Sequence, residues 1–301
     1  MRVSTSQIFD SSVQSMNSSL TEAVKYQQQI STGQSYSKAS ENPYAVSWGV
    51  RLSFDKSRLT MYTNNQNYVT ASMDSASTQL GSMIDAMNQL TSVSVQAQNG
   101  SLTSSALNAL YQQASQIAKT IQGQATAKDA SGNPIFPSSI NSVQIEPGVS
   151  VDSGILTSDA FGKDLNSLSQ ADLASATDAN LVGKTDVLAK INQFVAYLGH
   201  KAGVPAYANN TSSLTDVSSG LTSAYNQLQD AQTHSGLVGS LVSQASSAVN
   251  SLSTQLASTT STLLDTDMAA ATAGFTKNQA ILNAAQVLFG KLQSSDLFSK
   301  L

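Results

Sequence analysis

Residues 221–263 read LTSAYNQLQDAQTHSGLVGSLVSQASSAVNSLSTQLASTTSTL, and they carry the longest regular pattern in the chain. Apolar or small residues recur there in alternating steps of three and four, which is the heptad spacing of a coiled-coil seam. The members of this seam are Leu221, Ala224, Leu228, Ala231, Ser235, Val238, Val242, Ala245, Val249, Leu252, Leu256, Thr259 and Leu263. Such a repeat predicts a long helix that packs along other helices, because an ordinary globular core needs no helix of that length.

A second seam follows after the pattern slips by one residue at Leu263 and Leu264. Its members are Leu264, Met268, Ala271, Phe275, Asn278, Leu282, Ala285, Phe289 and Leu292. Asp265, Thr266 and Asp267 lie at the slip. We expect a hinge or a local kink there, with the aspartates acting in helix capping rather than as metal ligands.

The N-terminal third of the chain has the same character. A first helix is expected to end near Gly33, which suits the left-handed position after a helix, and its seam contains Phe9, Val13, Met16, Leu20, Ala23 and Ile30. Pro43 suits the first position of a second helix, and either Ser40 or Asn42 supplies its cap. The stripe of this second helix contains Leu52, Leu59, Tyr62, Val69, Met73, Ala76, Leu80, Met83, Met87 and Leu90. At about 1.5 Å per residue, a helix over 44–98 is a rod of roughly 80 Å, and a shorter helix is predicted over 102–126.

The amino-acid composition changes between residues 127 and 212, which hold four of the five prolines. Alternating apolar residues on both sides of 146–148 predict a β-hairpin, and 185–198 is typical of a short amphipathic helix. We interpret 127–212 as a small inserted domain. The predicted fold class is mainly α: a long coiled-coil rod formed by the N- and C-terminal helices, with the small α+β domain inserted at its distal end.

The composition offers little for catalysis. The chain has no cysteine and two histidines, His200 and His234, which are too few ligands for a zinc or iron site. The sequence contains neither a glycine-rich phosphate loop after a strand nor a nucleophile elbow. The single tryptophan, Trp48, is interpreted as a packing residue near a helix start. We therefore expect no enzyme activity, no metal and no cofactor.

Charge and hydropathy exclude two further kinds of partner. The net charge of −4 gives no basic surface for nucleic acid. No run of about 18 apolar residues is present, so we expect no membrane insertion. The N-terminal residues also lack the charged and apolar regions of a cleaved secretory signal.

Four stretches resemble the bacterial flagellin superfamily. They are 1–5 (MRVST) together with Phe9, 29–34 (QISTGQ), 40–46 (SENPYAV), and 263–269 (LLDTDMA) followed by 281–301. The similarity covers residues 1–126 and 213–301. Within the superfamily, the opening MRVST, the segment 128–136 and the ending 296–301 are more similar to the member that joins the flagellar hook to the filament than to flagellin itself.

This resemblance implies a structural axial protein of the bacterial flagellum, which joins hook to filament by packing of helical rods between subunits. It implies export through the flagellar type III apparatus without a cleaved signal peptide, and an extracellular location at the hook–filament junction. The implied partners are copies of the chain itself, the adjacent hook-associated junction protein, flagellin and a cytoplasmic export chaperone.

The same resemblance makes the terminal helices the candidate site for assembly and chaperone binding. The expected interface residues are Phe9, Val13, Met16, Leu20, Ile30, Phe275, Leu282, Phe289, Leu292, Leu297, Phe298 and Leu301. The expected domains are 1–43 (N-terminal assembly helix and loop), 44–126 (N-terminal rod helices), 127–212 (inserted outer α+β domain), 213–264 (C-terminal rod helix) and 265–301 (C-terminal assembly helix).

Two other interpretations stay open at this point. A filament-forming flagellin would show itself if the purified protein assembled into long filaments. A coiled-coil protein similar to a type III secretion translocator belongs to a different class. It would need a long apolar hairpin or a basic amphipathic face, and the sequence shows neither.

Overall fold

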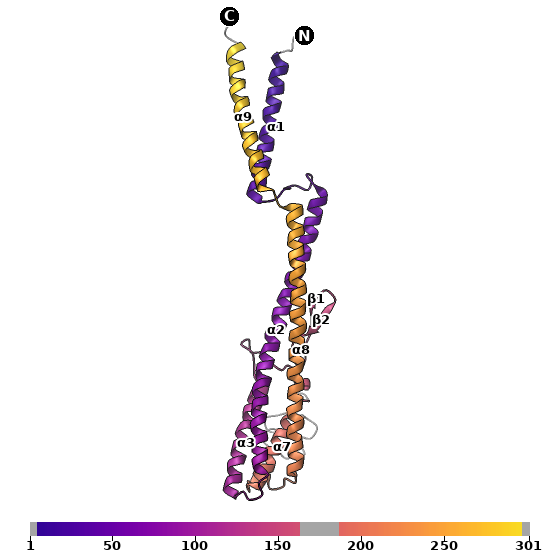
Figure 1. Ribbon diagram of the computed structural model, residues 1–301, viewed down its shortest axis with the longest axis vertical. Coiled ribbons are helices and arrows are strands. Elements are labelled where there is room, and N and C mark those ends of the chain that lie inside the picture. Colours follow the sequence, from indigo (N-terminus) through magenta and orange to yellow (C-terminus); the bar gives the residue numbers. More distant parts are fainter. Residues whose placement is uncertain (1–4, 163–186, 297–301) are drawn as a thin grey trace. The chain divides into compact units, whose positions relative to one another are not determined.

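The computed structural model describes residues 5–162 and 187–296. The chain divides into two compact units: Met1–Arg58 with Ser251–Leu301 form unit 1, and Leu59–Asn250 form unit 2. Helices dominate both units, as predicted, and two long ones, α2 (Pro43–Ala97) and α8 (Leu214–Leu264), contribute residues to each (Figure 1).

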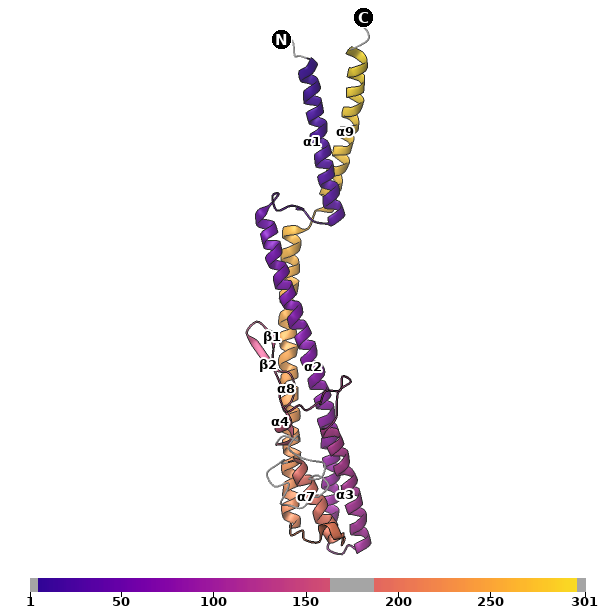
Figure 2. The same ribbon diagram turned by 180° about the vertical axis from the view of Figure 1, so that it is seen from behind.

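In unit 2, α2 and α8 run antiparallel to each other (Figure 2). Two polar contacts between small side chains fix their register. The Ser235 hydroxyl donates to the Met73 carbonyl at 3.0 Å, and the hydroxyls of Ser94 and Ser218 are 2.9 Å apart. In this unit Leu59 of the stripe predicted for α2 is half-buried, and the stripe is buried from there on, at Tyr62, Val69, Met73, Ala76, Leu80, Met83, Met87 and Leu90.

Two further helices complete the helical part of unit 2. Helix α3 (Ser104–Ala125) begins after Thr103, whose side chain accepts a hydrogen bond from a backbone amide of the first turn. Helix α7 (Val187–Lys201) packs against α3 and is followed by the short helix η2 (Pro205–Tyr207). The described part of the predicted helix over 185–198 is thus confirmed, because residues 187–198 lie in α7.

The predicted hairpin is present. Strands β1 (Ser142–Glu146) and β2 (Val149–Asp152) pair antiparallel, and Gly148 takes a φ of 81° in the turn between them. Helix α2 is bonded to this hairpin, because the Gln66 amide nitrogen donates to the Ile145 carbonyl at 2.8 Å. The hairpin is therefore anchored to the rod through a buried polar contact rather than by apolar packing alone.

The middle of the chain shares one hydrophobic core with the long helices. Buried members of this core from each element are Leu80 and Leu90 of α2, Ile121 of α3, Ile145 of β1, Phe161 of α4 (Thr157–Phe161), Phe194 of α7 and Leu221 of α8. The sequence predicted a separate domain over 127–212, whereas the described part of that segment lies in one compact unit with α2, α3 and α8. A pair of helices leaves much apolar surface uncovered, and the middle segment covers it.

Unit 1 contains helices α1 (Thr5–Thr32) and α9 (Met268–Asp296). Helix α1 ends as predicted, since the next residue, Gly33, has a φ of 71°. The helix is interrupted where the pattern slips, because α8 ends at Leu264 and α9 starts at Met268, with three residues between them. Of the two cap candidates before α2, Asn42 is the one whose side-chain oxygen accepts from a first-turn amide, at 3.0 Å.

The predicted seam of α8 holds in unit 2 and fails beyond it. Its members from Leu221 to Val249 are buried, but Leu252 is 45% exposed. The seam members Leu256, Thr259 and Leu263 are only half-buried. The prediction that Leu252 is buried is therefore wrong for this chain. The helices that widen the core around α8, namely α3 and α7, belong to unit 2 only.

Candidate functional site

Helices α1 and α9 lie side by side and antiparallel in unit 1 (Figures 1 and 2). Each turns one stripe toward the other, and these stripes are buried or half-buried. On α1 the stripe contains Val13, Met16, Ser19, Ala23, Tyr26 and Ile30; on α9 it contains Ala271, Gly274, Phe275, Asn278, Leu282, Ala285 and Phe289. The seam predicted for α9 is therefore largely covered within the same chain, and Met268, its first member on α9, is the exception at 47% exposure.

The two helices approach each other closely at Gly274. A Cβ atom added to Gly274 would lie 2.6 Å from Cζ of the Tyr26 ring. The ring thus occupies the space that any larger residue would need. Neither residue belongs to the predicted interface, because a glycine adds nothing to an apolar pattern and Tyr26 lies one position away from the seam.

The predicted interface residues fall into four groups. Six are half-buried in the contact between α1 and α9: Val13, Met16, Ile30, Phe275, Leu282 and Phe289. Leu20 lies outside this contact and is 49% exposed, because Ser19 takes the buried position instead. Phe9 and Leu292 lie in α1 and α9, and Leu297, Phe298 and Leu301 lie outside the described residues.

An apolar surface remains on these two helices after they pair. Apart from Met268 at the start of α9, the large apolar side chains that stay at least 40% exposed are Leu20 and Val24 on α1 and Ile281, Val287 and Leu288 on α9. We call these five residues the outer face. Sequence analysis missed four of them, because a heptad search assigns the best-matching stripe to the interface and leaves the rest to solvent.

Few charges interrupt the outer face. Helix α1 carries Asp10, Glu22 and Lys25, and α9 carries Lys277, Lys291 and Asp296. A pocket of about 260 Å³ also opens between the two helices, where Leu288 and Phe289 of α9 face Ser12 of α1. Apolar side chains on a sparsely charged helix pair, beside an incompletely filled pocket, are typical of a surface that another molecule covers.

The start of α2 adds a second group of exposed side chains to unit 1. Tyr44 and Trp48 contact each other with ring centroids 6.2 Å apart, and the Arg51 guanidinium lies 5.5 Å from the Trp48 ring centroid. Trp48 is 36% exposed, so its packing is local to the helix. Phe54, on the same helix, is 72% exposed.

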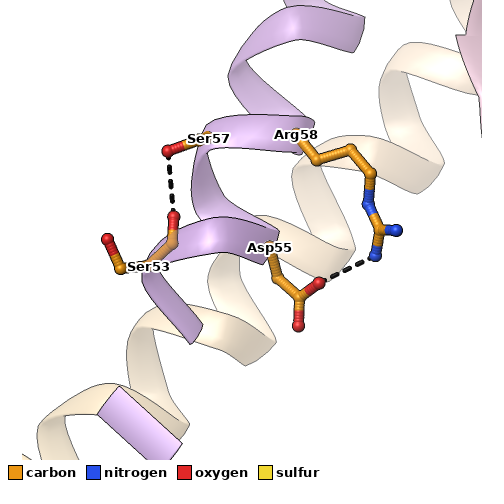
Figure 3. Close-up of polar contacts among 4 residues, drawn as sticks. All are labelled: Ser53, Asp55, Ser57 and Arg58. Atoms are coloured by element: carbon orange, nitrogen blue, oxygen red, sulfur yellow. Dashed lines mark hydrogen bonds and ion pairs between the residues drawn. The ribbon is translucent and has the colours of Figure 1, made fainter. Parts of the chain in front are cut away.

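The polar groups near Phe54 satisfy one another within α2. Arg58 pairs with Asp55 at 2.7 Å, and the Ser57 hydroxyl donates to the Ser53 carbonyl at 2.9 Å (Figure 3). An exposed pair of this kind contributes little to stability, about 0.3–0.5 kcal/mol. These groups show no convergence on a common point that would suit a substrate.

Across 5–162 and 187–296, no three His, Asp or Glu side chains lie where they could hold a metal ion. His200 lies 3.0 Å from the Tyr207 carbonyl through Nδ1, and His234 is exposed. Asp267 caps α9, accepting hydrogen bonds from two first-turn amides at 3.0 Å. Within the same residues, no helix is long and apolar enough to cross a membrane.

Comparison with known families decides what kind of protein carries this helix pair. The model of the bacterial flagellin N-terminal helical region matches residues 3–137, and that of the C-terminal helical region matches residues 219–299. The chain belongs to the bacterial flagellin family. It is therefore a structural component of the bacterial flagellum and not an enzyme.

Solved structures with a similar fold agree with this membership. A protein of Vibrio parahaemolyticus assigned as a flagellar hook-associated protein aligns with a TM-score of 0.59 and 16% identity, covering 74% of this chain and 99% of its own. FlgL of Xanthomonas campestris aligns with a TM-score of 0.52 and 16% identity, covering 68% of this chain and 98% of its own. The search of curated proteins gave no match.

Both family matches include the terminal helices, so α1 and α9 are part of the flagellin-family framework. The outer face and the α1–α9 contact thus belong to the regions that the family shares, while the middle segment with β2 and α7 lies between the two matches. The candidate assembly surface therefore lies on helices that the family matches cover.

Proposed function

We propose that the chain joins the flagellar hook to the filament, and that the outer face of α1 and α9 is where it packs against neighbouring subunits. The observation that carries the proposal is the outer face itself, five large apolar side chains left exposed on a helix pair with few charges. The names of the similar solved structures, a hook-associated protein and FlgL, support the junction rather than the filament.

The energetics favour burial of this face in an assembly. Each large apolar side chain gains about 1.5–3 kcal/mol when it is fully buried. Part of this gain is offset by the loss of motional freedom on association. A face of five residues is small for a stable pair of molecules. In a ring of subunits the same small contact is repeated many times, and the free energies of these contacts add. Such a face therefore suits an axial component better than a free dimer.

The same face suits the other partners that the proposal includes. Copies of the chain, the adjacent hook-associated junction protein and flagellin would contact it after export. A cytoplasmic export chaperone would cover it beforehand, because an exposed apolar surface favours non-specific association. Export without a cleaved signal peptide, to the extracellular hook–filament junction, completes the proposal.

The proposal is tested in a strain that lacks the gene. We expect such cells to keep hooks, to lose filaments and to release unassembled flagellin into the medium. If the purified chain instead forms long filaments alone, seen by electron microscopy, the chain is a filament-forming flagellin and the junction proposal fails.

The outer face is tested by the double substitution Val287→Lys/Leu288→Lys, introduced into the complementing gene. Both side chains are at least 60% exposed. Their replacement should therefore leave the stability of the free chain within about 0.5 kcal/mol, while swimming is lost because lysines would have to be buried between subunits. Leu241→Lys, at a 41% exposed position of α8 in unit 2, is the matched control and should swim normally. Normal swimming of the double variant would refute the assignment of this face.

A further inference from the structure

The loop between α2 and α3 contains the one asparagine of the chain that is followed by glycine (Figure 1). Residues 98–103 read QNGSLT, and Asn99 lies two residues beyond Ala97, where α2 ends. Asn99, Gly100 and Ser101 are all exposed and lie outside helices and strands. The side chain of Asn99 is therefore free to react with the backbone that follows it.

The reaction that this pair allows is loss of the asparagine amide without an enzyme. The backbone nitrogen of Gly100 attacks Cγ of Asn99 and gives its proton to water, so that a cyclic imide forms and ammonia leaves. Water then opens the imide. Opening between Cγ and the nitrogen gives aspartate, and opening between the backbone carbonyl carbon and the nitrogen gives isoaspartate. The sum is an amide and water converted to a carboxylate and ammonium, which needs no oxidant and no cofactor.

Three features of the loop favour the attack. The Ser101 amide donates to Oδ1 of Asn99 at 3.1 Å, so it polarises the carbonyl that is attacked and stabilises the negative charge that develops on its oxygen. The Gly100 amide has no hydrogen-bond partner among the described residues, which leaves its proton open to water. Glycine also has no side chain that could shield its nitrogen, and a Cβ atom added at Gly100 would meet nothing within 4 Å.

Asn210 offers a comparison within the same unit. Its Oδ1 accepts from the Ser212 amide at 3.0 Å, the same kind of hydrogen bond that Asn99 makes to the second residue after it. The next residue, however, is Thr211, whose stiff branched side chain crowds its own nitrogen. The two asparagines thus share the polarising hydrogen bond and differ in the access of the attacking nitrogen.

We propose that Asn99 deamidates spontaneously to aspartate and isoaspartate in the folded chain, and that chains in the flagellum accumulate this change with age. The chemistry concerns unit 2 alone and is tested first on the purified chain. The accumulation rests on the proposed function, because it requires that the chain stays in place outside the cell long after its synthesis.

The product changes the end of α2. The sequence has no charged residue between Asp85 and Lys119, so the new carboxylate is the first charge in this stretch of the chain. It lies beside the carbonyl groups that end the helix, where a negative charge is unfavourable. The amides of Gln98 and Asn99 donate to carbonyl groups of the last turn at 3.2 Å each, and these two hydrogen bonds should open more often after deamidation.

The first test follows the purified full chain over several weeks at mildly alkaline pH. Mass spectrometry of peptides records loss of the amide, and an isoaspartyl methyltransferase assay records isoaspartate. Asn99 should react at least about tenfold faster than Asn210, because the glycine nitrogen can reach Cγ. A rate at Asn99 no higher than the rate at Asn210 would contradict the proposal.

Gly100→Ala is the matched control. Gly100 is not among the glycines with positive φ, and the added Cβ meets nothing within 4 Å, so alanine fits without strain. The variant should fold normally, which circular dichroism checks, while its rate at Asn99 falls at least about tenfold. Equal rates at Asn99 in the parent and in Gly100→Ala would overturn the proposal.

A second test separates the effect of the fold from that of the dipeptide. Thr211→Gly gives Asn210 the same neighbour as Asn99 and should raise the rate at Asn210 at least about tenfold; no acceleration would contradict the role of the glycine nitrogen. In urea the hydrogen bond from Ser101 is lost, so Asn99 should react no more slowly in the folded chain than in urea. A slower reaction in the folded chain would show that the loop protects Asn99, which overturns the proposal.

The effect on α2 is measured with Asn99→Asp, and Asn99→Ser is the uncharged control. Amide hydrogen exchange at Gln98 and at residue 99 should be about two- to fivefold faster in the aspartate variant, as expected for a charge at the unfavourable end of a helix. Equal exchange in the two variants would refute the effect of the new charge on α2.

The final test concerns the assembled state. Chains recovered from flagella should contain a larger fraction of aspartate and isoaspartate at position 99 than chains from the cytoplasm of the same cells, when both samples are digested in the same way. Equal fractions would overturn the accumulation with age. Absence of the chain from flagella would instead refute the proposed function and leave the result on the purified chain standing.

Discussion

The substitution Val242→Asp tests the shared core of unit 2. Val242 lies on α8 and is 3% exposed, within the core that α2, α3 and α7 also line. Its neighbour Leu241 lies on the same helix and is 41% exposed. The two positions therefore have nearly the same helix environment and differ in whether the side chain enters the core.

The cost of Val242→Asp has two parts. Loss of the buried valine removes about 1.5 kcal/mol of apolar burial, the lower end of the range for such side chains. A carboxyl group placed in the core without a partner costs a further 1–3 kcal/mol, roughly. The sum is about 2.5–4.5 kcal/mol, which for a unit of this size corresponds to a fall in melting temperature of about 5–18 °C. Leu241→Asp should cost no more than about 0.5 kcal/mol.

The free energy of unfolding and the melting temperature of both variants are measured by urea and thermal unfolding of the full chain, followed by far-ultraviolet circular dichroism. Two transitions are a reasonable expectation for a chain with two compact units, and the effect should fall on the transition of unit 2. Equal destabilisation by Val242→Asp and Leu241→Asp would refute the assignment of the core face of α8.

Three other changes have defined outcomes. Gly274→Ala should force the Tyr26 ring out of the α1–α9 contact and raise amide hydrogen exchange across α9, since the added Cβ would lie 2.6 Å from the ring; unchanged exchange would contradict the close approach. Asp267→Ala should cost about 1 kcal/mol of helix stability through loss of the α9 cap, with earlier fraying of the first turn by exchange, whereas Asp267→Asn should retain most of it. The backbone amide of Asn133, followed by its side chain and the Ser131 amide, holds the pKa of Asp129 below its usual value. A lowered pKa stabilises the folded loop above the unfolded pKa of about 3.9, so exchange protection over 129–133 should persist at pH 4–5, roughly, and disappear as pH falls through the lowered pKa; loss of protection already at neutral pH would contradict it.

The sequence predicted the helices well because their cores are periodic. An apolar residue every three or four positions indicates a helix and no other secondary structure for α2, α8 and α9. The breaks at Gly33 and at Asp265 mark where each helix ends. The hairpin turn at Gly148 was equally plain, since a proline–glycine pair between alternating residues has few other uses.

The partners of each stripe could not be predicted in the same way. A heptad pattern shows which side of a helix is apolar, and it does not show how many helices cover that side. Leu252 continues the pattern of α8 but is 45% exposed, while Ser19 replaces Leu20 in the narrow contact that a single partner helix makes. The family resemblance pointed to the terminal helices, and the structure divided them into an inner contact and an outer face.

The backbone pairing of residues 33–35 with 264–266 and the contact at Gly274 could not be predicted from the sequence for a different reason. Backbone hydrogen bonds between Ser35 and Leu264 leave no side-chain signature, and their partners are far apart in the chain. Gly274 allows the close contact with Tyr26 because it has no side chain, and an apolar pattern does not record such a position. The shared core of unit 2 was also missed, because the composition of 127–212 suggested an independent domain although its apolar residues face the long helices.

The central claim is that the outer face of α1 and α9 is buried between subunits in the flagellum. It is tested most directly by introducing one cysteine at this face, as Leu288→Cys, into the otherwise cysteine-free chain and measuring its reaction with a maleimide. Leu288 is 61% exposed in the free chain, so the cysteine should react there about as fast as it does in denaturant. In intact flagella we expect protection of at least about tenfold, and a cysteine that reacts equally fast in flagella and in the free chain would contradict burial of this face.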